Sequence, residues 1–246
     1  MLPNDNQFLG ADVTFAQVAE VLQNAGLEPD KIELDFNPLV IEDGDRTVLI
    51  DTGFGNLHSF AGKLPLNLKS AGIEPEKITD VIISHAHPDH LSGAFNDRGE
   101  LSFAKARHYI SALDWDFLAS QPGAEAKMRA LEPQIHLVEP NAEIIPHITA
   151  IHAPGHTPGQ IALSIESDGE SLLFIGDAVH HFVISLAHPE WHVGKDADRI
   201  LAAETRASLI ETAARNTLFV QGYHFPFPGL GHILHGDGGF FWQARR

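Results

Sequence analysis

The segment His85-Ala86-His87-Pro88-Asp89-His90 places four metal-binding side chains within six residues. The first two histidines follow an apolar strand at positions i and i+2, where an extended backbone directs both side chains to one side. Placing several imidazoles and a carboxylate at the end of a buried strand costs desolvation free energy unless something binds them. The segment therefore indicates a metal site. The alternative is a polar surface loop that contains these histidines by chance.

Three more metal-binding side chains occur later, each just after a short apolar strand: His156, Asp177 and His224. Taken singly, each has an ordinary interpretation, since Gly-Asp after a strand is usually a turn and a lone loop histidine is usually structural. Their shared position at strand ends, together with the first segment, indicates a single constellation of metal ligands.

The composition narrows the chemistry that this constellation could perform. The 246 residues include 16 histidines and no cysteine. Disulfides, cysteine nucleophiles, iron–sulfur clusters and thiolate zinc sites are thereby excluded, and histidine and carboxylate are the strong metal ligands that remain. The net charge of −17, with no basic cluster beyond Arg245-Arg246, argues against nucleic acid and against an anionic membrane surface. An anionic substrate is not excluded, because a bound metal can reverse the local field.

The length and the N-terminal segment lead to further expectations. A chain of 246 residues with 43% apolar side chains is expected to form a single domain over residues 1–246. The start, MLPNDNQFLG, has no basic or apolar leader, and no apolar run reaches the ~20 residues of a membrane span. We therefore expect a cytoplasmic protein that binds a small molecule.

The elements that must position the ligands can be read from apolar periodicity and from Gly and Pro punctuation. Helices are expected at residues 16–25, 64–71, 112–118, 124–131 and 196–214. Strands are expected at residues 39–41, 47–50, 80–84, 107–111, 148–152, 161–165, 172–175, 218–221 and 240–242. Strands in runs separated by helices predict a mixed α/β protein with sheets covered by helices. The pattern fits two packed sheets with outer helices and also an open doubly wound sheet.

The motif HxHxDH followed by His, Asp and His resembles the metallo-β-lactamase superfamily. The intervals from His90 to His156, from there to Asp177 and from there to His224 are 66, 21 and 47 residues, which suit its hydrolase branches. The similarity begins at the segment VLIDTG, residues 48–53. It implies an αββα sandwich with the metal site at the edge between the two sheets.

The resemblance also implies a set of metal ligands. One ion would be held by His85, His87 and His156. The other would be held by Asp89, His90 and His224, with Asp177 bridging both. The expected cofactors are two divalent ions, most often zinc, with manganese, iron or cobalt as alternatives. Asp51 resembles the family's aspartate that accepts a hydrogen bond from a ligand histidine. Its alternative is a turn at a strand end.

The implied reaction is hydrolysis of an ester, lactone or phosphotriester by a hydroxide that bridges the two ions, with Asp89 and Asp177 in catalytic positions. Members with a cysteine ligand are excluded, and His87 stands where the diiron oxygen-reducing branch usually has Glu. The nuclease and glyoxalase branches carry basic or RNA-binding elements that this chain lacks. The segments 64–73, 85–93 and 225–232 instead resemble the methyl parathion hydrolase and lactonase branch. The rival interpretation is a non-hydrolytic member, either an iron redox protein or a metal-stabilised binding module.

His180 departs from the family pattern. In acyl-homoserine lactonases a catalytic tyrosine lies three residues after the bridging aspartate, and His180 occupies that position here. We expect its imidazole to be catalytic by donating a hydrogen bond to the leaving alkoxide. The alternative is that His180 and His181 are exposed loop histidines.

Four aromatic residues flank the ligand-bearing segments: Phe182, Trp191, Phe225 and Phe227. They are expected to form an apolar pocket over the metals, or else to pack in the core or in a homodimer interface. Family members usually have one or two strands ahead of the first helix, and at most fifteen residues precede it here. Either the enzyme is naturally short, or an upstream segment with a targeting signal is missing. In the second case the protein would be periplasmic or secreted.

Overall fold

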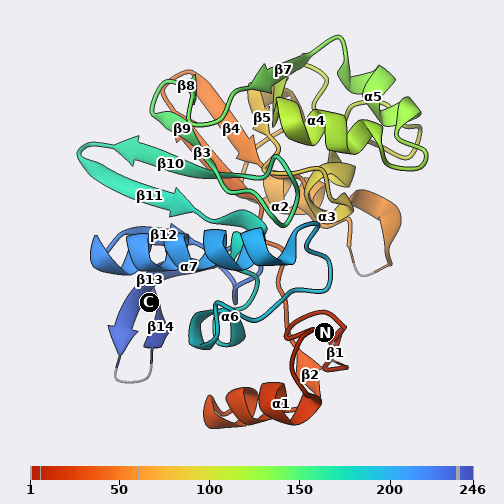
Figure 1. The fold of residues 1–246 in the computed structure, drawn as a ribbon. Helices are drawn as coiled ribbons and strands as arrows, with labels where there is room; N and C mark the ends of the chain where they lie inside the picture. The colour runs from red at the N-terminus through yellow and green to blue at the C-terminus, as the bar shows by residue number, and fades with distance from the viewer. Residues whose placement is uncertain (1, 6, 60, 237–238, 246) are drawn as a thin grey trace. The chain divides into compact units, whose positions relative to one another are not determined.

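The computed structural model describes residues 2–5, 7–59, 61–236 and 239–245. The chain divides into two units. The central unit is Pro38–Pro140, and the discontinuous unit combines Met1–Asn37 with Asn141–Arg246. Each unit contains its own sheet and its own helices (Figure 1).

The central unit is built on a five-stranded sheet. In sheet order its strands are β3 (Leu39–Asp43), β4 (Arg46–Ile50), β5 (Asp80–Ile82), β6 (Arg107–Ser111) and β7 (Ile135–Val138). The β3–β4 pair is an antiparallel hairpin, and β4 to β7 run parallel. Because β4, β5 and β6 run in one direction, the segments that follow them begin at the same edge of the sheet.

Helices cover one face of this sheet (Figure 1). They are α2 (Leu64–Ser70), α4 (Ala112–Ala119) and α5 (Glu125–Leu131); the short α3 (Pro88–Leu91) and the 3₁₀ turns η1 (Gly55–Leu57), η2 (Pro75–Lys77) and η3 (Ser92–Ala94) lie in the connections. Val81 and Ile110 of the sheet pack with Leu118 and Leu131 of the helices. Each such side chain contributes about 1.5–3 kcal/mol when fully buried.

The discontinuous unit is built on a seven-stranded sheet. In sheet order its strands are β14 (Gly239–Ala244), β13 (Leu230–Gly236), β12 (Phe219–Gln221), β11 (Glu170–Phe174), β10 (Ile161–Ser167), β9 (Ile148–His152) and β8 (Glu143–Ile145). The β11–β12 pair is parallel and the other pairs are antiparallel. The strands β9, β11 and β12 therefore run in the same direction and end at one edge.

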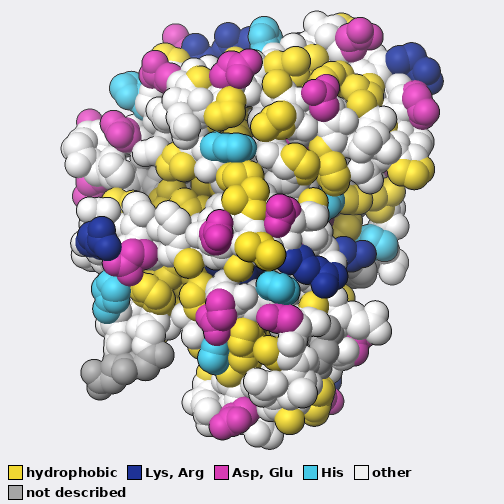
Figure 2. Space-filling view, in the orientation of Figure 1, with side chains coloured by type: hydrophobic (Ala, Val, Ile, Leu, Met, Phe, Trp, Pro, Cys, Tyr) yellow, Lys and Arg dark blue, Asp and Glu magenta, His cyan; other side chains and the backbone are white. Residues whose placement is uncertain are grey.

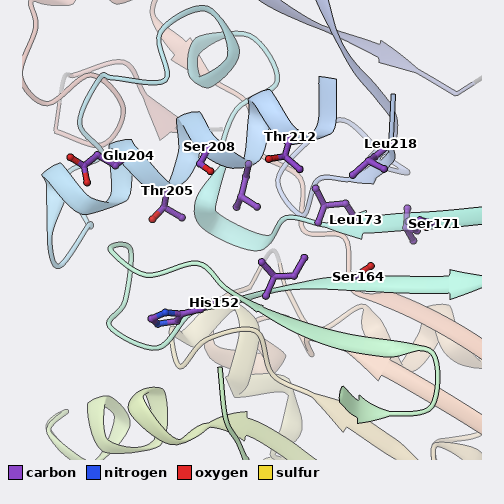
Figure 3. Close-up of a pocket in the computed structure, with 12 residues that line it drawn as sticks. His152, Ser164, Ser171, Leu173, Glu204, Thr205, Ser208, Thr212 and Leu218 are labelled. Atoms are coloured by element: carbon purple, nitrogen blue, oxygen red, sulfur yellow. The ribbon is translucent and has the colours of Figure 1, made fainter. Parts of the chain in front are cut away.

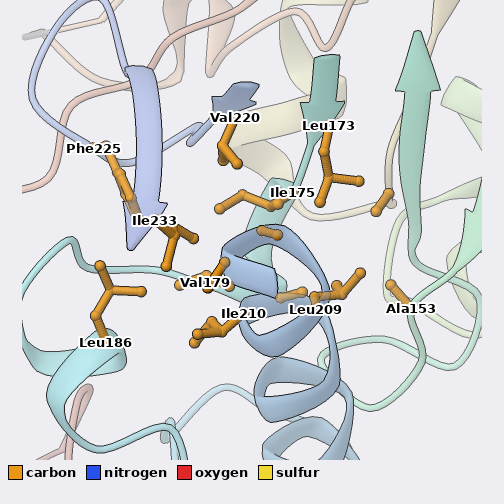
Figure 4. Packing of buried hydrophobic residues seen from close by; sticks show 14 residues of the cluster. Ala153, Leu173, Ile175, Val179, Leu186, Leu209, Ile210, Val220, Phe225 and Ile233 are labelled. Atoms are coloured by element: carbon orange, nitrogen blue, oxygen red, sulfur yellow. The ribbon is translucent and has the colours of Figure 1, made fainter. Parts of the chain in front are cut away.

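Helix α7 (Arg199–Arg215) lies across this sheet. Figure 4 shows Leu209 and Ile210 of α7 packed among Leu173, Val220 and Ile233 of the strands. A smaller cluster packs α1 (Phe15–Asn24) near the loop before α7, and the turn η4 (Gly176–Ala178) and α6 (Ile184–Ala187) follow β11. Strand β1 (Leu2–Pro3) precedes α1 and pairs with β2 (Lys31–Ile32).

The expected helices are present, with shifted ends. The helix expected at 196–214 begins at Arg199, because the Asp198 side chain accepts a hydrogen bond from the Leu201 backbone N–H and caps it. The strand expected at 80–84 ends at Ile82. The sequence did not predict α6, β7, β8, β13 or the short β1–β2 pair, which are brief or interrupted by glycine.

The charged side chains on the surface reflect the acidic composition of the chain. Acidic side chains are spread over the face shown in Figure 2, interspersed with basic and apolar ones. Among the described residues, no helix is both long and apolar enough to cross a membrane.

Candidate metal centre

In the central unit, four of the predicted ligands follow strand β5. His85 lies three residues after the strand, and α3 begins at Pro88, which places Asp89 and His90 in its first turn. Proline suits this first helical position because its missing N–H is not needed there. His85 and His90 are fully buried, whereas His87 and Asp89 are partly exposed. The arrangement leaves this cluster of donors reachable from solvent.

Asp51 organises this cluster from the end of β4. Its carboxylate accepts hydrogen bonds from the Ser84 backbone N–H at 2.7 Å, from Ser84 Oγ at 2.7 Å and from His90 Nδ1 at 2.6 Å. This is the acceptor role that the family resemblance implied for Asp51. With the proton of His90 on Nδ1, the lone pair lies on Nε2, which is 3.5 Å from Asp89 Oδ2.

The backbone of the His85–His87 segment is held from helix α4. Asp114 lies buried in the first turn of α4 and accepts a hydrogen bond from the Ala86 N–H at 2.6 Å. His85 Nδ1 lies 3.2 Å from Ser84 Oγ, and His85 Nε2 lies 3.2 Å from His87 Nδ1. The ring nitrogens of the two histidines thus face each other, as two ligands of one ion would.

In the discontinuous unit, the other predicted ligands follow β9, β11 and β12, whose ends share an edge. The Nε2 atoms of two histidines face the carboxylate of Asp177. His156 Nε2 lies 3.4 Å from Asp177 Oδ2, and His224 Nε2 lies 3.1 Å from Asp177 Oδ1. All three side chains are buried. Tertiary structure therefore brings together residues that are separated by up to 68 positions in the sequence.

The other nitrogen of each histidine is already bonded. His156 Nδ1 donates to Asp196 Oδ1 at 2.8 Å, and His224 Nδ1 donates to the Asp35 backbone carbonyl at 2.8 Å. The neutral rings therefore present Nε2 lone pairs to a carboxylate, a contact that is repulsive unless a positive charge lies between them. A divalent cation supplies that charge. The donor set thus fits a metal ion.

The charges around His156 affect its ionisation. Burial alone lowers the pKa of His156, but hydrogen bonds and charges from Asp177 and Asp196 outweigh burial and raise it. Burial also acts to raise the pKa of Asp196, and the histidines and Arg206 outweigh that effect and lower it. Without a cation, a proton on His156 would satisfy the same carboxylates.

His180 and His181 are buried, so the exposed-loop interpretation is wrong for both. His180 Nε2 lies 3.3 Å from Asp177 Oδ2, and the Phe8 ring meets the imidazole edge-on at 5.5 Å. Burial lowers the pKa of His180, partly offset by Asp177, which favours a neutral imidazole. His181 Nδ1 accepts hydrogen bonds from the backbone N–H groups that begin α6, and burial lowers its pKa to about 3. His181 is therefore structural.

The four flanking aromatic residues do not share one environment. Phe225 and Trp191 are buried in two different core clusters, which is the packing alternative, and Phe182 packs against the cluster that contains Phe225. Phe227 is 82% exposed. The sequence did not single out Phe36, whose ring lies edge-on to His224 at 5.2 Å.

A separate cavity of about 470 Å³ lies between α7 and strands β9 to β11. Figure 3 shows Thr205, Ser208 and Thr212 of α7 on one wall and His152 opposite. None of the predicted ligands lines it, so this cavity is not the candidate metal centre.

Sequence reasoning did not single out the residues that hydrogen-bond to the predicted ligands or to their neighbours: Asp35, Asp114, Asp196 and Arg206. One signal was available. Arg206 occupies an apolar stripe of α7 that also contains Ala202, Leu209 and Ala213, where a charged side chain needs a buried partner.

Comparisons with known proteins point to one superfamily. Residues 37–224 match the family model described as the Metallo-beta-lactamase superfamily. An N-acyl homoserine lactonase from a Bacillus species is 30% identical over 103 residues, which are 41% of this chain and 38% of the relative. The chain thus aligns with less than half the length of this curated relative.

Two solved structures resemble almost the whole chain. One is AidC, a dizinc quorum-quenching lactonase with a bound product, at a TM-score of 0.93, 27% identity and coverage of 98% of this chain and 89% of that one. The other is the hydrolase AbOPH of the β-lactamase superfamily, with a TM-score of 0.90 and 27% sequence identity. The similarity covers 100% of this chain and 90% of that one. The expected fold class is confirmed.

Proposed function

The chain belongs to the metallo-β-lactamase superfamily, and from that premise we propose that it is a dinuclear metal-dependent lactonase. Its substrate would be an uncharged, fairly apolar lactone with an acyl side chain. The observation that carries the proposal is the pair of Nε2 atoms, of His156 and His224, that face the Asp177 carboxylate with both Nδ1 positions already bonded.

The proposed ligand assignment follows the family motif. One ion is assigned to His85, His87 and His156. The other is assigned to Asp89, His90 and His224, with Asp177 shared between them. The hydrogen bonds from His90 to Asp51, from His156 to Asp196 and from His224 to Asp35 support this assignment, because each leaves Nε2 as the ligand atom. Zinc is the metal we propose, since a dizinc lactonase is among the similar structures.

Two bound divalent ions would activate a water molecule near neutral pH and polarise the scissile carbonyl. The side chains of this chain then have separate tasks. Asp177 would supply the negative charge that holds the ions beside His156 and His224. When the ring C–O bond of the lactone breaks, the leaving oxygen needs a hydrogen bond, and neutral His180 can donate one from a ring N–H. The product is a hydroxy acid.

The substrate class rests on the comparisons and on two contacts between aromatic rings and histidines. The Bacillus relative is an N-acyl homoserine lactonase, and AidC was solved with a homoserine product. In the discontinuous unit, Phe36 lies against His224 and Phe8 against His180, which places apolar rings beside polar groups. Apolar rings beside a few polar groups are typical of sites for ligands such as an acyl chain attached to a polar ring.

Hydrolysis assays on metal-loaded protein test the proposal. The metal-free chain is loaded with zinc, cobalt or manganese and assayed on acyl-homoserine lactones of increasing chain length, an aryl ester and a phosphotriester. We expect the lactones to give the highest kcat/KM and chelation to abolish turnover. A higher kcat/KM for the phosphotriester would show that phosphotriesters, and not lactones, are the substrate class. Redox-active iron without hydrolysis would favour the non-hydrolytic alternative.

A further inference from the structure

Helix α7 carries a fully buried arginine on its apolar side. Arg206 is 1% exposed and sits in the stripe that otherwise packs against the sheet. Burying a guanidinium costs several kcal/mol unless its charge and its N–H groups are satisfied. A leucine or methionine would fill such a position without that cost. The arginine therefore needs an explanation beyond packing.

The guanidinium satisfies its donors with one carboxylate and three backbone carbonyls. Arg206 Nη2 donates to Asp196 Oδ2 at 3.2 Å, and Nε donates to the Ala178 carbonyl at 3.1 Å. Nη1 donates to the carbonyls of Pro189 and Trp191, each at 2.8 Å. One side chain thus joins the turn at residues 176–178 to the loop at residues 189–196.

Both of these segments contact the predicted ligands of the discontinuous unit. Asp196 uses its other oxygen to accept from His156 Nδ1 at 2.8 Å, so Arg206 and His156 bind opposite ends of one buried carboxylate. Ala178 directly follows Asp177 in the chain. A hydrogen bond to the Ala178 carbonyl therefore fixes the turn that presents the Asp177 carboxylate.

We propose that Arg206 is a positioning residue of the metal centre: it fixes Asp196, which sets the orientation and proton position of His156, and it fixes the turn that carries Asp177. The inference rests on the proposed function only in taking His156 and Asp177 as ligands. Removal of Arg206 should weaken binding of the ion assigned to His156 by roughly 10–100-fold, the usual effect of losing a partner of a ligand.

Lysine is not an adequate replacement at this position. The planar guanidinium points N–H groups in three directions at once, and lysine offers a single ammonium on a flexible stem. Arg206→Lys keeps the charge beside Asp196 but cannot reach Ala178, Pro189 and Trp191 together. We therefore expect an effect between those of the wild type and Arg206→Met.

The decisive experiment measures metal binding directly. Zinc affinities of the wild type, Arg206→Lys, Arg206→Met and Asp196→Asn are obtained by competition with a chromophoric chelator, and the visible spectrum of the cobalt-loaded proteins is recorded. We expect one of the two zinc equivalents to weaken by 10–100-fold and the cobalt bands to shift. For lactones, kcat should fall more than KM rises. Arg215→Met, an exposed position on the same helix, is the matched control.

Wild-type zinc affinities and cobalt spectra in folded Arg206→Lys and Asp196→Asn would overturn the inference. Circular dichroism establishes folding, and these two conservative variants decide the matter if Arg206→Met does not fold. Failure of the proposed function has a different signature. In that case the wild type binds two ions without hydrolysing lactones, while the effect of Arg206 on zinc affinity persists.

Discussion

Asp177 is the residue at which the polar contacts of the discontinuous unit converge. Ring nitrogens of three histidines lie close to its carboxylate, at 3.4 Å for His156, 3.3 Å for His180 and 3.1 Å for His224. All four side chains are buried. In a low-dielectric interior, the repulsion between this carboxylate and the Nε2 lone pairs of His156 and His224 is stronger than in water, so the arrangement calls for a positive charge between them. Single substitutions here should have large and separable effects.

Asp177→Asn should lower kcat by about 10²-fold or more, because the neutral amide removes a charge that stabilises both ions and the transition state. Metal content and steady-state kinetics are the measurements. Asp168→Asn, in an exposed turn of the same unit, is the control and should behave as the wild type. If Asp177→Asn keeps full metal occupancy and near-normal turnover, Asp177 is not a metal ligand.

His180→Ala should lower kcat for lactones by roughly 10²-fold, a usual contribution of a proton donor to a leaving group. Activated aryl esters should lose only several-fold, because nitrophenolate leaves without a donor. The comparison of the two substrate types is the measurement, with exposed His235→Ala as control. Equal losses of kcat on both substrates would show that His180 has a structural role. No loss on either substrate would show that His180 takes no part in the reaction.

At the level of elements, the loop after β9 is fixed by the N-terminal part of α7. The Asp198 N–H donates to the Gly155 carbonyl at 2.9 Å, and Thr205 Oγ1 donates to the Pro154 carbonyl at 2.7 Å. Gly155 has a φ of +121°, and a Cβ there would lie 2.2 Å from the Ala202 backbone nitrogen. The loop that presents His156 thus depends on a close approach between backbone segments.

Gly155→Ala should push this loop away from α7 and weaken zinc binding by about 10-fold or more, because the orientation of His156 changes. The unfolding temperature should also fall. Gly123→Ala is the matched control, since its φ is +76° and nothing lies within 4 Å of an added Cβ. It shares the cost of a left-handed residue, about 1–2 kcal/mol, without the clash. If both variants bind zinc like the wild type, the close approach does not position His156.

For the whole molecule, the seven predicted ligands are distributed over both units, four in one and three in the other. The central unit contains His85, His87, Asp89 and His90, and the discontinuous unit contains His156, Asp177 and His224 with His180. Each unit thus supplies ligands to the proposed assignment. Metal binding and folding are then linked.

Removal of metal should therefore lower the stability of the whole chain. An ion present at 100 times its dissociation constant stabilises the folded state by about 2.7 kcal/mol. We expect chelation to lower the unfolding temperature and zinc to restore it, as measured by calorimetry. Hydrogen exchange should increase in both units. An increase confined to one unit would show that the predicted ligands of the other unit do not bind metal.

Acidification should destabilise the metal-free chain through His108, which is buried in the central unit. Burial, partly offset by a backbone hydrogen bond at Ala106, lowers the pKa of His108 from 6.5 to about 4. Between these values the unfolded chain binds a proton that the folded chain does not. Stability is therefore complete above pH 6.5 and falls by about 3 kcal/mol towards pH 4.

Denaturant unfolding of the metal-free wild type and of His108→Phe, at pH 7 and pH 5, measures this effect. The variant should lose less stability than the wild type on acidification. Identical pH dependence in the two proteins would show that another group controls acid stability.

The sequence by itself determined the family and its metallo-hydrolase chemistry, and it predicted a set of metal ligands. The HxHxDH segment is local, and its residue types are costly at the end of a buried strand, so a few adjacent positions indicated a metal site. His156, Asp177 and His224 were found by their common position after apolar strands. The main helices and the longer strands followed from apolar periodicity.

Only the tertiary structure decided which groups hydrogen-bond to the predicted ligands. His224 bonds to Asp35, 189 positions away in the chain, and His156 bonds to Asp196, which Arg206 anchors. Such contacts produce no periodic pattern in the sequence, because they depend on where the strand ends and α7 lie in space. Burial of His180 and the core position of Phe225 were likewise undecided by the sequence. A side chain's exposure is set by its neighbours in space, which the order of residues along the chain does not specify.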